Sequence, residues 1–249
     1  MENDIKAYVR PNIGDFIISN VKTVQMANLP VMICERATPS LFYVAMKRAM
    51  DIVISLIGLV IASPFLLITA IAIKAYDHGP VFYKQVRLTK NGREFKILKF
   101  RSMKVDAEKD GVARLSSEND DRITPVGKVI RACRIDELPQ FINILKGDLA
   151  VVGPRPERPE IAAQYVEEMP EFSLRLQVKA GLTGYAQVYG KYNTEPYDKL
   201  QMDLMYVNQM GLVSDVKIIL ATIKILFMPE STEGIAAGQT TASGKVKIQ

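Results

Sequence analysis

The stretch GLVIASPFLLITAI, from Gly58 to Ile71, lies in the middle of the longest uncharged run of the chain, which extends from Ile52 to Ile73. A helix over this run would be about 33 Å long, enough to cross a hydrocarbon core of roughly 30 Å. Pro64 removes one backbone donor and crowds the carbonyl of Val60, which favours a break at Ser63-Pro64. We therefore expect two half-helices of about 12 and about 10 residues, each too short to span the bilayer.

Basic residues flank the run on both sides. Lys47 and Arg48 precede it, and six more basic residues follow it, namely Lys74, Lys84, Arg87, Lys90, Arg93 and Lys96. Because basic flanks favour the cytoplasmic side, both ends are expected on that side, as in a re-entrant hairpin. The Ser63 hydroxyl is then available to a carbonyl freed at the break. A proline-kinked spanning helix and a buried helix of a soluble core are the alternatives.

Composition restricts the remaining classes of protein. With 249 residues, 48% of them hydrophobic, the chain can bury the core of one sizeable domain. Its net charge of +5 suits an anionic membrane surface or phosphorylated ligands, and no signature of nucleic-acid binding accompanies it. Cys34 and Cys133 lack the spacing of a metal site, so we expect reduced thiols.

Two adjacent carboxylates are the first candidate functional residues. Helical periodicity predicts one helix over residues 126–133, and Pro139 is placed to open a second helix that Gly147 closes. Asp136 and Glu137 would lie at or just before the second helix, where the helix dipole favours ionised carboxylates. Such a pair suits a nucleophile or a metal ligand. The alternative is an acidic cap that pairs with the neighbouring arginines.

A proline-rich loop is the second candidate. In the sequence VGPRPERPE, Arg155 and Arg158 lie between three prolines, which limit backbone freedom and suit the presentation of a guanidinium group to phosphate. The alternative is a polyproline-like surface turn. Further on, Gly181, Gly184 and Gly190 could let the backbone approach a ligand closely.

Taken together, these motifs resemble the bacterial sugar transferases, also called monotopic phosphoglycosyl transferases or polyprenyl-phosphate hexose-1-phosphate transferases. The resemblance covers about Leu29 to Phe227. It rests on KRAMDI, the central SPF, GPVFYKQ, FKILKFRSM, RIDELPQFINILKGDL, VGPRPE and GLTGYAQV, all in the family's order. The chain is most similar to the catalytic half of the long, exopolysaccharide-type members, so this half is expected to stand nearly alone here.

The resemblance implies a reaction. Members of the family transfer sugar-1-phosphate from a UDP-sugar to polyprenyl (undecaprenyl) phosphate, which yields polyprenyl-diphosphate-sugar and UMP in the first membrane step of exopolysaccharide, capsule or glycan assembly. The family's dyad maps onto Asp136, as the nucleophile that forms an aspartyl-phosphosugar, and Glu137, as the ligand of Mg²⁺. The cations that would bind the phosphates are Lys99, Arg101, Arg131, Arg134 and Arg155.

The resemblance also implies a location and a set of partners. The re-entrant helix would lie in the inner leaflet of the bacterial plasma membrane, with the catalytic domain on the cytoplasmic face. The expected partners are a UDP-sugar, polyprenyl phosphate and the leaflet itself, without nucleic acid; a homo-oligomer is left open. Two residues depart from the family's pattern: Thr89 stands where Gly is frequent, and Ile135 where Ser or Thr is frequent.

The predicted fold is an α-rich α+β fold. It combines the membrane helix hairpin broken at Ser63-Pro64, a small β-hairpin around Asn91-Gly92, and amphipathic membrane-surface helices near residues 197–210 and 214–227, all around a cytoplasmic active site. Four regions are expected: an N-terminal stub or linker at 1–40, the interfacial and re-entrant helix at 41–75, the catalytic domain at 76–228 and a disordered tail at 229–249. The stub should contain a strand at Pro30 to Ile33, and the catalytic domain an acidic surface loop near 106–121.

Two other functions compete with this prediction. A catalytically silent, membrane-anchored scaffold for glycan-assembly enzymes would have no need of Asp136, Glu137 and Arg155 together. A glycosidase needs carboxyl groups about 5 to 9 Å apart on both sides of a glycosidic bond, which adjacent residues can hardly provide.

Overall fold

The structure is a computed structural model that describes residues 7–9, 23–26, 29–34, 39–107, 120–190 and 194–226. The chain divides into two compact units, Met1–Ser40 and Leu41–Gln249. The first unit contains the strands β1 (Ala7–Val9), β2 (Thr23–Met26) and β3 (Leu29–Cys34), which form an antiparallel sheet with β3 in the centre. The strand expected at Pro30 to Ile33 is therefore confirmed. Its two short partners were not predicted.

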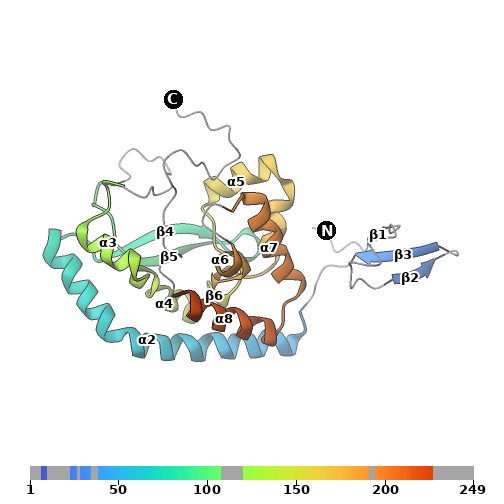
Figure 1. Cartoon of the computed structure of the whole chain (residues 1–249), viewed down its shortest axis with the longest axis horizontal. Coiled ribbons are helices and arrows are strands. Elements are labelled where there is room, and N and C mark those ends of the chain that lie inside the picture. The colour runs from blue at the N-terminus through green and yellow to red at the C-terminus, as the bar shows by residue number, and fades with distance from the viewer. Residues whose placement is uncertain are drawn as a thin grey trace. The chain divides into compact units, whose positions relative to one another are not determined.

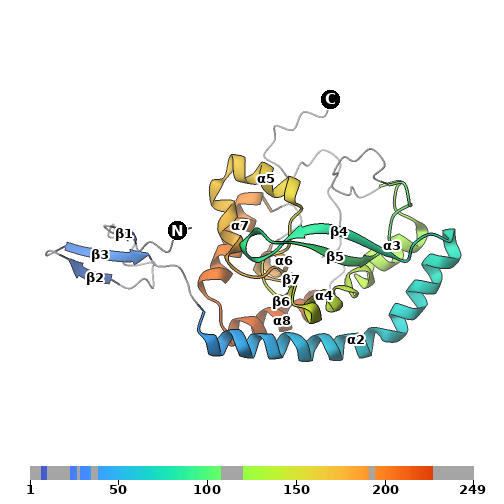
Figure 2. The same cartoon turned by 180° about the vertical axis from the view of Figure 1, so that it is seen from behind.

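The second unit carries the candidate site and is rich in helices, as Figures 1 and 2 show from opposite sides. Its long helix, α2, runs along one side of the other elements (Figure 1). In chain order the elements are α2 (Leu41–Asp77), β4 (Phe82–Leu88), η1 (Lys90–Gly92), β5 (Glu94–Phe100), α3 (Pro125–Ala132), η2 (Ile135–Glu137), α4 (Gln140–Lys146), β6 (Ala150–Val152), α5 (Pro159–Glu168), η3 (Pro170–Gln177), β7 (Gly181–Thr183), α6 (Tyr185–Tyr189), α7 (Pro196–Asn208) and α8 (Leu212–Leu226).

Helix α2 corrects the prediction of two half-helices broken at Ser63-Pro64. It is one helix of 37 residues that contains Pro64, although it bends along its length (Figure 2). The Ser63 hydroxyl donates to the carbonyl of Val60 at 2.8 Å. This is the carbonyl that the missing N–H of Pro64 would otherwise leave without its helical donor. Ser63 thus supplies the expected bond, and the helix continues through the proline.

The surface of α2 argues against a helix buried in a soluble core. It is long and apolar enough to cross a membrane, yet only 17% of its most apolar 18-residue window is buried within the protein. Val60, Ile61 and Leu67 all expose more than half of their surface. Exposure of so many contiguous apolar side chains to water would be costly, so this face is suited to lipid.

The β-hairpin is confirmed. Strands β4 and β5 pair antiparallel, from Phe82 opposite Phe100 to Leu88 opposite Glu94. The turn between them places Asn91 and Gly92 at φ 60° and 71°, the left-handed region that these two residue types tolerate best. Alternation along β5 then puts Lys99 on the same face as the buried Phe95 and Ile97. This register directs the Lys99 side chain toward the interior of the unit.

The predicted helices are also present. α3 and α4 correspond to the helices predicted at 126–133 and 139–147, and α7 and α8 correspond to those predicted at 197–210 and 214–227. Thr124 caps α3 by accepting a hydrogen bond from Gly127 N, and Gly147 ends α4 at φ 87°. Elements α5, η3, β7 and α6 were not predicted. The expected loop and tail lie largely outside the described residues.

The main core lies where α4, β5, β6, α7 and α8 meet. Its most deeply buried members are Ile144, Leu149, Val152, Tyr206 and Ile218, each with 1% or less of its surface exposed. Burial of this apolar surface fixes α4 and β6 relative to β5. The dyad precedes α4 and the proline-rich loop follows β6, so the same core positions both candidate segments.

Candidate active site

The two predicted carboxylates lie together in η2, between α3 and α4. Arg134 precedes them at φ 54° and ψ 21°, a left-handed conformation that is uncommon for a residue with a side chain. Arg134 follows the end of α3 and directs the chain into η2. The Asp136 side chain is buried, with 9% of the residue exposed.

Glu137 brings together two of the predicted phosphate-binding cations. Its Oε1 accepts a hydrogen bond from Lys99 Nζ at 2.8 Å and from Arg155 NH2 at 3.2 Å. Burial alone would raise the pKa of Glu137, but the two cations outweigh it and the pKa lies below its ordinary value. The contact in turn raises the pKa of Arg155. Segments from β5, η2 and the loop after β6 therefore meet at one carboxylate.

Asp136 differs from the sequence expectation. Burial, followed by the charge of Glu137, raises the pKa of Asp136 to about 6, although Lys99, Arg131 and Arg155 act in the opposite direction. From their position at a helix start, both carboxylates were predicted to be stabilised as anions. For Asp136 this prediction is wrong, because removal from water and a like charge outweigh the dipole of the seven-residue helix α4. An aspartate with a raised pKa is a stronger nucleophile when ionised.

The remaining predicted cations fall into two groups. Arg131 and Arg134 lie close enough to shift the pKa of Asp136 and Glu137 respectively. Arg101 is instead buried against Asp77, to which both terminal nitrogens donate, while its Nε donates to the Pro80 carbonyl at 2.6 Å. The structure therefore pairs Arg101 with the end of α2 rather than with the dyad.

The glycine-rich segment packs closely against the backbone at Gly153. A side chain at Gly181 would meet the backbone nitrogen of Gly153 at 2.1 Å, and one at Gly184 would meet the Gly153 carbonyl at 2.2 Å. The backbone here approaches the start of the proline-rich loop. Gly153 N donates to the Thr183 carbonyl at 2.8 Å. The glycines thus allow β6 and β7 to hold that loop closely.

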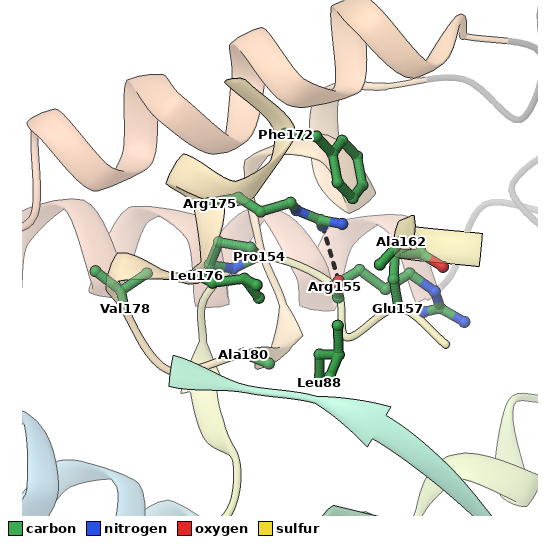
Figure 3. Close-up of a pocket in the computed structure, with 10 residues that line it drawn as sticks. All are labelled: Leu88, Pro154, Arg155, Glu157, Ala162, Phe172, Arg175, Leu176, Val178 and Ala180. Atoms are coloured by element: carbon green, nitrogen blue, oxygen red, sulfur yellow. Dashed lines mark hydrogen bonds between the residues drawn. The ribbon is translucent and has the colours of Figure 1, made fainter. Parts of the chain in front are cut away.

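Two arginines that bind the proline-rich loop were not predicted from the sequence: Arg175 is buried, and Arg87 is partly buried. Arg87 NH1 donates to the Pro156 carbonyl at 3.1 Å, and Arg175 NH2 donates to the Arg155 carbonyl at 2.8 Å. Figure 3 shows Arg175 directed at the backbone of Arg155. Neither arginine has a neighbour in the sequence that indicates this contact. Arg155 and Arg175 also line the same small cavity.

The donor set fits Mg²⁺ only in combination with a phosphorylated substrate. Among the residues that the structure describes, no group of three or more His, Cys, Asp or Glu side chains could hold a metal ion. Mg²⁺, however, is commonly bound by one or two carboxylates and by substrate phosphates, with water completing the octahedron. Asp136 and Glu137 provide two adjacent carboxylates. Hydrogen bonds from both cations converge on Oε1 of Glu137, whose other oxygen is the one suited to a metal.

The second unit thus combines a carboxylate dyad, cations from three segments and a long apolar helix that is suited to a membrane. The sequence profile of the family described as bacterial sugar transferase matches residues 42–229. The chain belongs to the bacterial sugar transferase family.

Individual relatives agree with this assignment. The chain is 42% identical over 191 residues to the UDP-N-acetylgalactosamine-undecaprenyl-phosphate N-acetylgalactosaminephosphotransferase of Aeromonas hydrophila, covering 76% of this chain and 45% of that protein. It is 37% identical over 218 residues to the UDP-glucose:undecaprenyl-phosphate glucose-1-phosphate transferase of Escherichia coli K12, covering 86% and 47%. A putative undecaprenyl-phosphate N-acetylgalactosaminyl 1-phosphate transferase of Bacillus subtilis is 49% identical over 134 residues, covering 54% and 74%. The chain thus spans about half the length of the first two relatives.

Proposed function

We propose that the protein transfers sugar-1-phosphate from a UDP-sugar to undecaprenyl phosphate through a covalent intermediate on Asp136. The observation that carries the proposal is the group formed by Asp136, Glu137, Lys99 and Arg155, in which a buried carboxylate of raised pKa adjoins a second carboxylate that holds two cations. The names of the relatives supply the substrate classes. A silent scaffold would have no use for this arrangement.

In the first step, an Asp136 carboxylate oxygen attacks the sugar-linked phosphorus of the UDP-sugar. The bond from this phosphorus to the bridging oxygen breaks, and UMP leaves with the electron pair. In the second step, a phosphate oxygen of undecaprenyl phosphate attacks the same phosphorus. The acyl-phosphate bond breaks, so the carboxylate is regenerated and the polyprenyl-diphosphate-sugar is released.

The cations of the site offset the charge that this chemistry gathers. A carboxylate that attacks a diphosphate brings together several negative charges, which need preorganised positive groups. Lys99 and Arg155 are held beside the dyad by Glu137, and Arg131 and Arg134 lie close by. Glu137, with Asp136, would hold Mg²⁺. When bound, Mg²⁺ would neutralise part of the charge of the diphosphate.

A panel of nucleotide sugars tests this function directly. The protein in detergent or in lipid nanodiscs is incubated with each UDP-sugar and with undecaprenyl phosphate, and UMP release is measured. We expect one hexose or N-acetylhexosamine substrate to give UMP and a lipid-linked product in equal amounts. Absence of UMP release across the panel would contradict the proposal.

The reaction should depend on pH through Asp136. Because the pKa of Asp136 is raised to about 6, its carboxylate is protonated in more acidic solution and loses its nucleophilicity. We expect kcat/KM for the UDP-sugar to fall about tenfold for each pH unit below about 6 and to level off above it. Initial rates of UMP release from pH 4.5 to 8.5 measure this profile. A flat profile across pH 5 to 7 would contradict the assignment of Asp136.

Metal removal should stop the reaction. If the dyad holds Mg²⁺ together with the diphosphate, EDTA should abolish UMP release, and an excess of Mg²⁺ should restore it. Ca²⁺, which is larger and less strictly octahedral, is the matched control and should restore much less. Full activity in EDTA, after the protein has been dialysed against the chelator, would remove the metal from the mechanism.

We also propose that α2 re-enters the membrane from the cytoplasmic face rather than spanning it. Near its start, Arg48 donates to the carbonyls of Ile144 and Leu145 at the end of α4, at 2.6 and 2.7 Å. Near its end, Ile73 is buried in a cluster with Phe100 and Ile130, and Asp77 pairs with Arg101. Both ends of α2 are thus bound to the same unit, and the basic flanks favour the same side of the membrane.

This arrangement predicts the labelling of single cysteines in intact cells. Ala45→Cys and Lys84→Cys, in a background with Cys34 and Cys133 replaced by serine, should both be protected from a membrane-impermeant maleimide. Both should react after the cells are permeabilised. Labelling of either residue from outside would show that α2 spans the membrane.

A further inference from the structure

The proline-rich loop is fixed through its carbonyl groups. Prolines at 154, 156 and 159 have no N–H to donate. The carbonyls of four successive residues instead accept hydrogen bonds from outside the loop, at distances between 2.8 and 3.1 Å: Pro154 from Gly181 N, Arg155 from Arg175 NH2, Pro156 from Arg87 NH1 and Glu157 from Leu88 N. Side chains supply two of these four donors. The position of this loop therefore depends on residues that the loop does not contain.

Arg175 is held more tightly than Arg87. Its NH2 lies 2.8 Å from the Arg155 carbonyl and 2.6 Å from Oδ2 of Asp203 on α7. Only 6% of the Arg175 side chain and 2% of the Asp203 side chain are exposed, and the guanidinium packs over the Phe172 ring at 4.7 Å. Burial of an ion pair is costly, and well-packed apolar side chains often stabilise a fold as well. A role beyond stability would account for a buried charge at this place.

A chain of contacts runs from this ion pair to the dyad. Asp203 orients Arg175, Arg175 holds the carbonyl of Arg155, and Arg155 NH2 reaches Oε1 of Glu137 at 3.2 Å. The Arg155 side chain is 48% exposed, so the surrounding protein restrains it only partly. The carbonyl and the side chain of Arg155 are joined at the same Cα atom. A rotation of the backbone at this residue would therefore redirect the guanidinium. Figure 3 shows the Arg155 side chain extending away from the atom that Arg175 binds.

We propose that Arg175, oriented by Asp203, is a positioning residue that fixes the backbone of Arg155 and thereby directs the Arg155 guanidinium to Glu137 and to the anionic substrate. The inference rests on the proposed function for the meaning of the Arg155 contact. Arg175 does not touch the substrate in this proposal. It acts through Arg155 alone, which distinguishes it from a residue that only stabilises the fold.

Hydrogen exchange tests the structural half of the proposal without any activity. Arg175→Lys keeps the positive charge for Asp203 but loses the planar guanidinium, whose NH2 serves both acceptors while its face packs over Phe172. We expect faster deuterium uptake in the peptide that contains Gly153 to Glu157. Arg122→Lys is the matched control, since Arg122 also pairs with an aspartate at 2.6 Å, and it should leave this peptide unchanged. Unchanged uptake in Arg175→Lys would overturn the proposal. If Arg175→Lys does not fold, Asp203→Asn is measured in its place.

A double-mutant cycle tests the functional half. From kcat/KM for UMP release, we expect a loss of about 10-fold for Arg175→Lys and about 100-fold for Arg155→Ala. Because Arg175 acts through Arg155, the double variant should lose about 100-fold rather than about 1,000-fold. A loss of about 1,000-fold in the double variant, as expected if the two substitutions act independently, would overturn the proposal. Absence of UMP release in the unsubstituted protein would instead refute the proposed function, and hydrogen exchange would still test the positioning of the loop.

Discussion

Asp136→Asn should lower the rate of UMP release by about 10⁴-fold or more, because a neutral amide cannot form the acyl phosphate. The substitution conserves volume and leaves Glu137 with its two cations, so binding of the UDP-sugar should change much less than kcat. Rates measured with saturating UDP-sugar and undecaprenyl phosphate test this expectation. Residual activity above about one hundredth of the original rate would show that Asp136 is not the nucleophile.

The same substitution should stabilise the protein. In the folded state the pKa of Asp136 is raised from 3.8 to about 6, so the folded state binds more protons than the unfolded state between these pH values. Stability is therefore lost as pH rises through this window, and the loss is complete above pH 6. Removal of the charge should add about 1–3 kcal/mol to the free energy of unfolding at pH 7.5. Thermal unfolding at pH 7.5 and pH 4 measures this gain, which should shrink at the lower pH.

Glu137→Gln should have the second-largest effect and the opposite effect on stability. Its carboxylate holds Lys99 and Arg155, and a neutral amide would leave these cations without a counter-charge beside the substrate. We expect UMP release to fall by about 10²- to 10³-fold. Because the folded-state pKa of Glu137 is lowered, its contribution to stability is present above the unfolded pKa of 4.5 and is lost in acid. At pH 7.5 the variant should lose about 1–3 kcal/mol.

Glu157→Gln is a suitable control for both substitutions. Glu157 lies in the proline-rich loop after β6, outside the dyad, and its carboxylate is 3.8 Å from NH1 of Arg87. Its removal should change the free energy of unfolding by less than about 1 kcal/mol. Equal stability changes in Asp136→Asn and Glu137→Gln would contradict the different environments of the two carboxylates.

Much of the local structure follows from the sequence because it depends on short-range rules. Asn91-Gly92 predicts the hairpin turn, Gly147 predicts the end of α4, and Ser63 serves the carbonyl that Pro64 leaves. The break that Pro64 led us to predict at Ser63-Pro64 is not present in α2. One serine hydrogen bond and packing against the rest of the unit keep α2 continuous where local preference favours interruption.

The site was predictable as a set of residues but not as an arrangement. Asp136, Glu137, Lys99 and Arg155 come together as the family resemblance implied, whereas Arg101 pairs with Asp77. The partner of an arginine depends on tertiary contacts between distant segments, which no local pattern encodes. The raised pKa of Asp136 likewise results from burial, and burial is a property of the folded core.

The most direct test of the account is the mass of the protein after incubation with its UDP-sugar in the absence of undecaprenyl phosphate. Intact-mass spectrometry should show an increase of one phosphosugar, and peptide mapping should place it on Asp136. Addition of undecaprenyl phosphate should discharge it, and Asp136→Asn should never acquire it. An adduct on Glu137 would contradict the assignment of the nucleophile. Turnover without any adduct, together with sequential rather than ping-pong kinetics, would show that the lipid phosphate attacks the UDP-sugar directly.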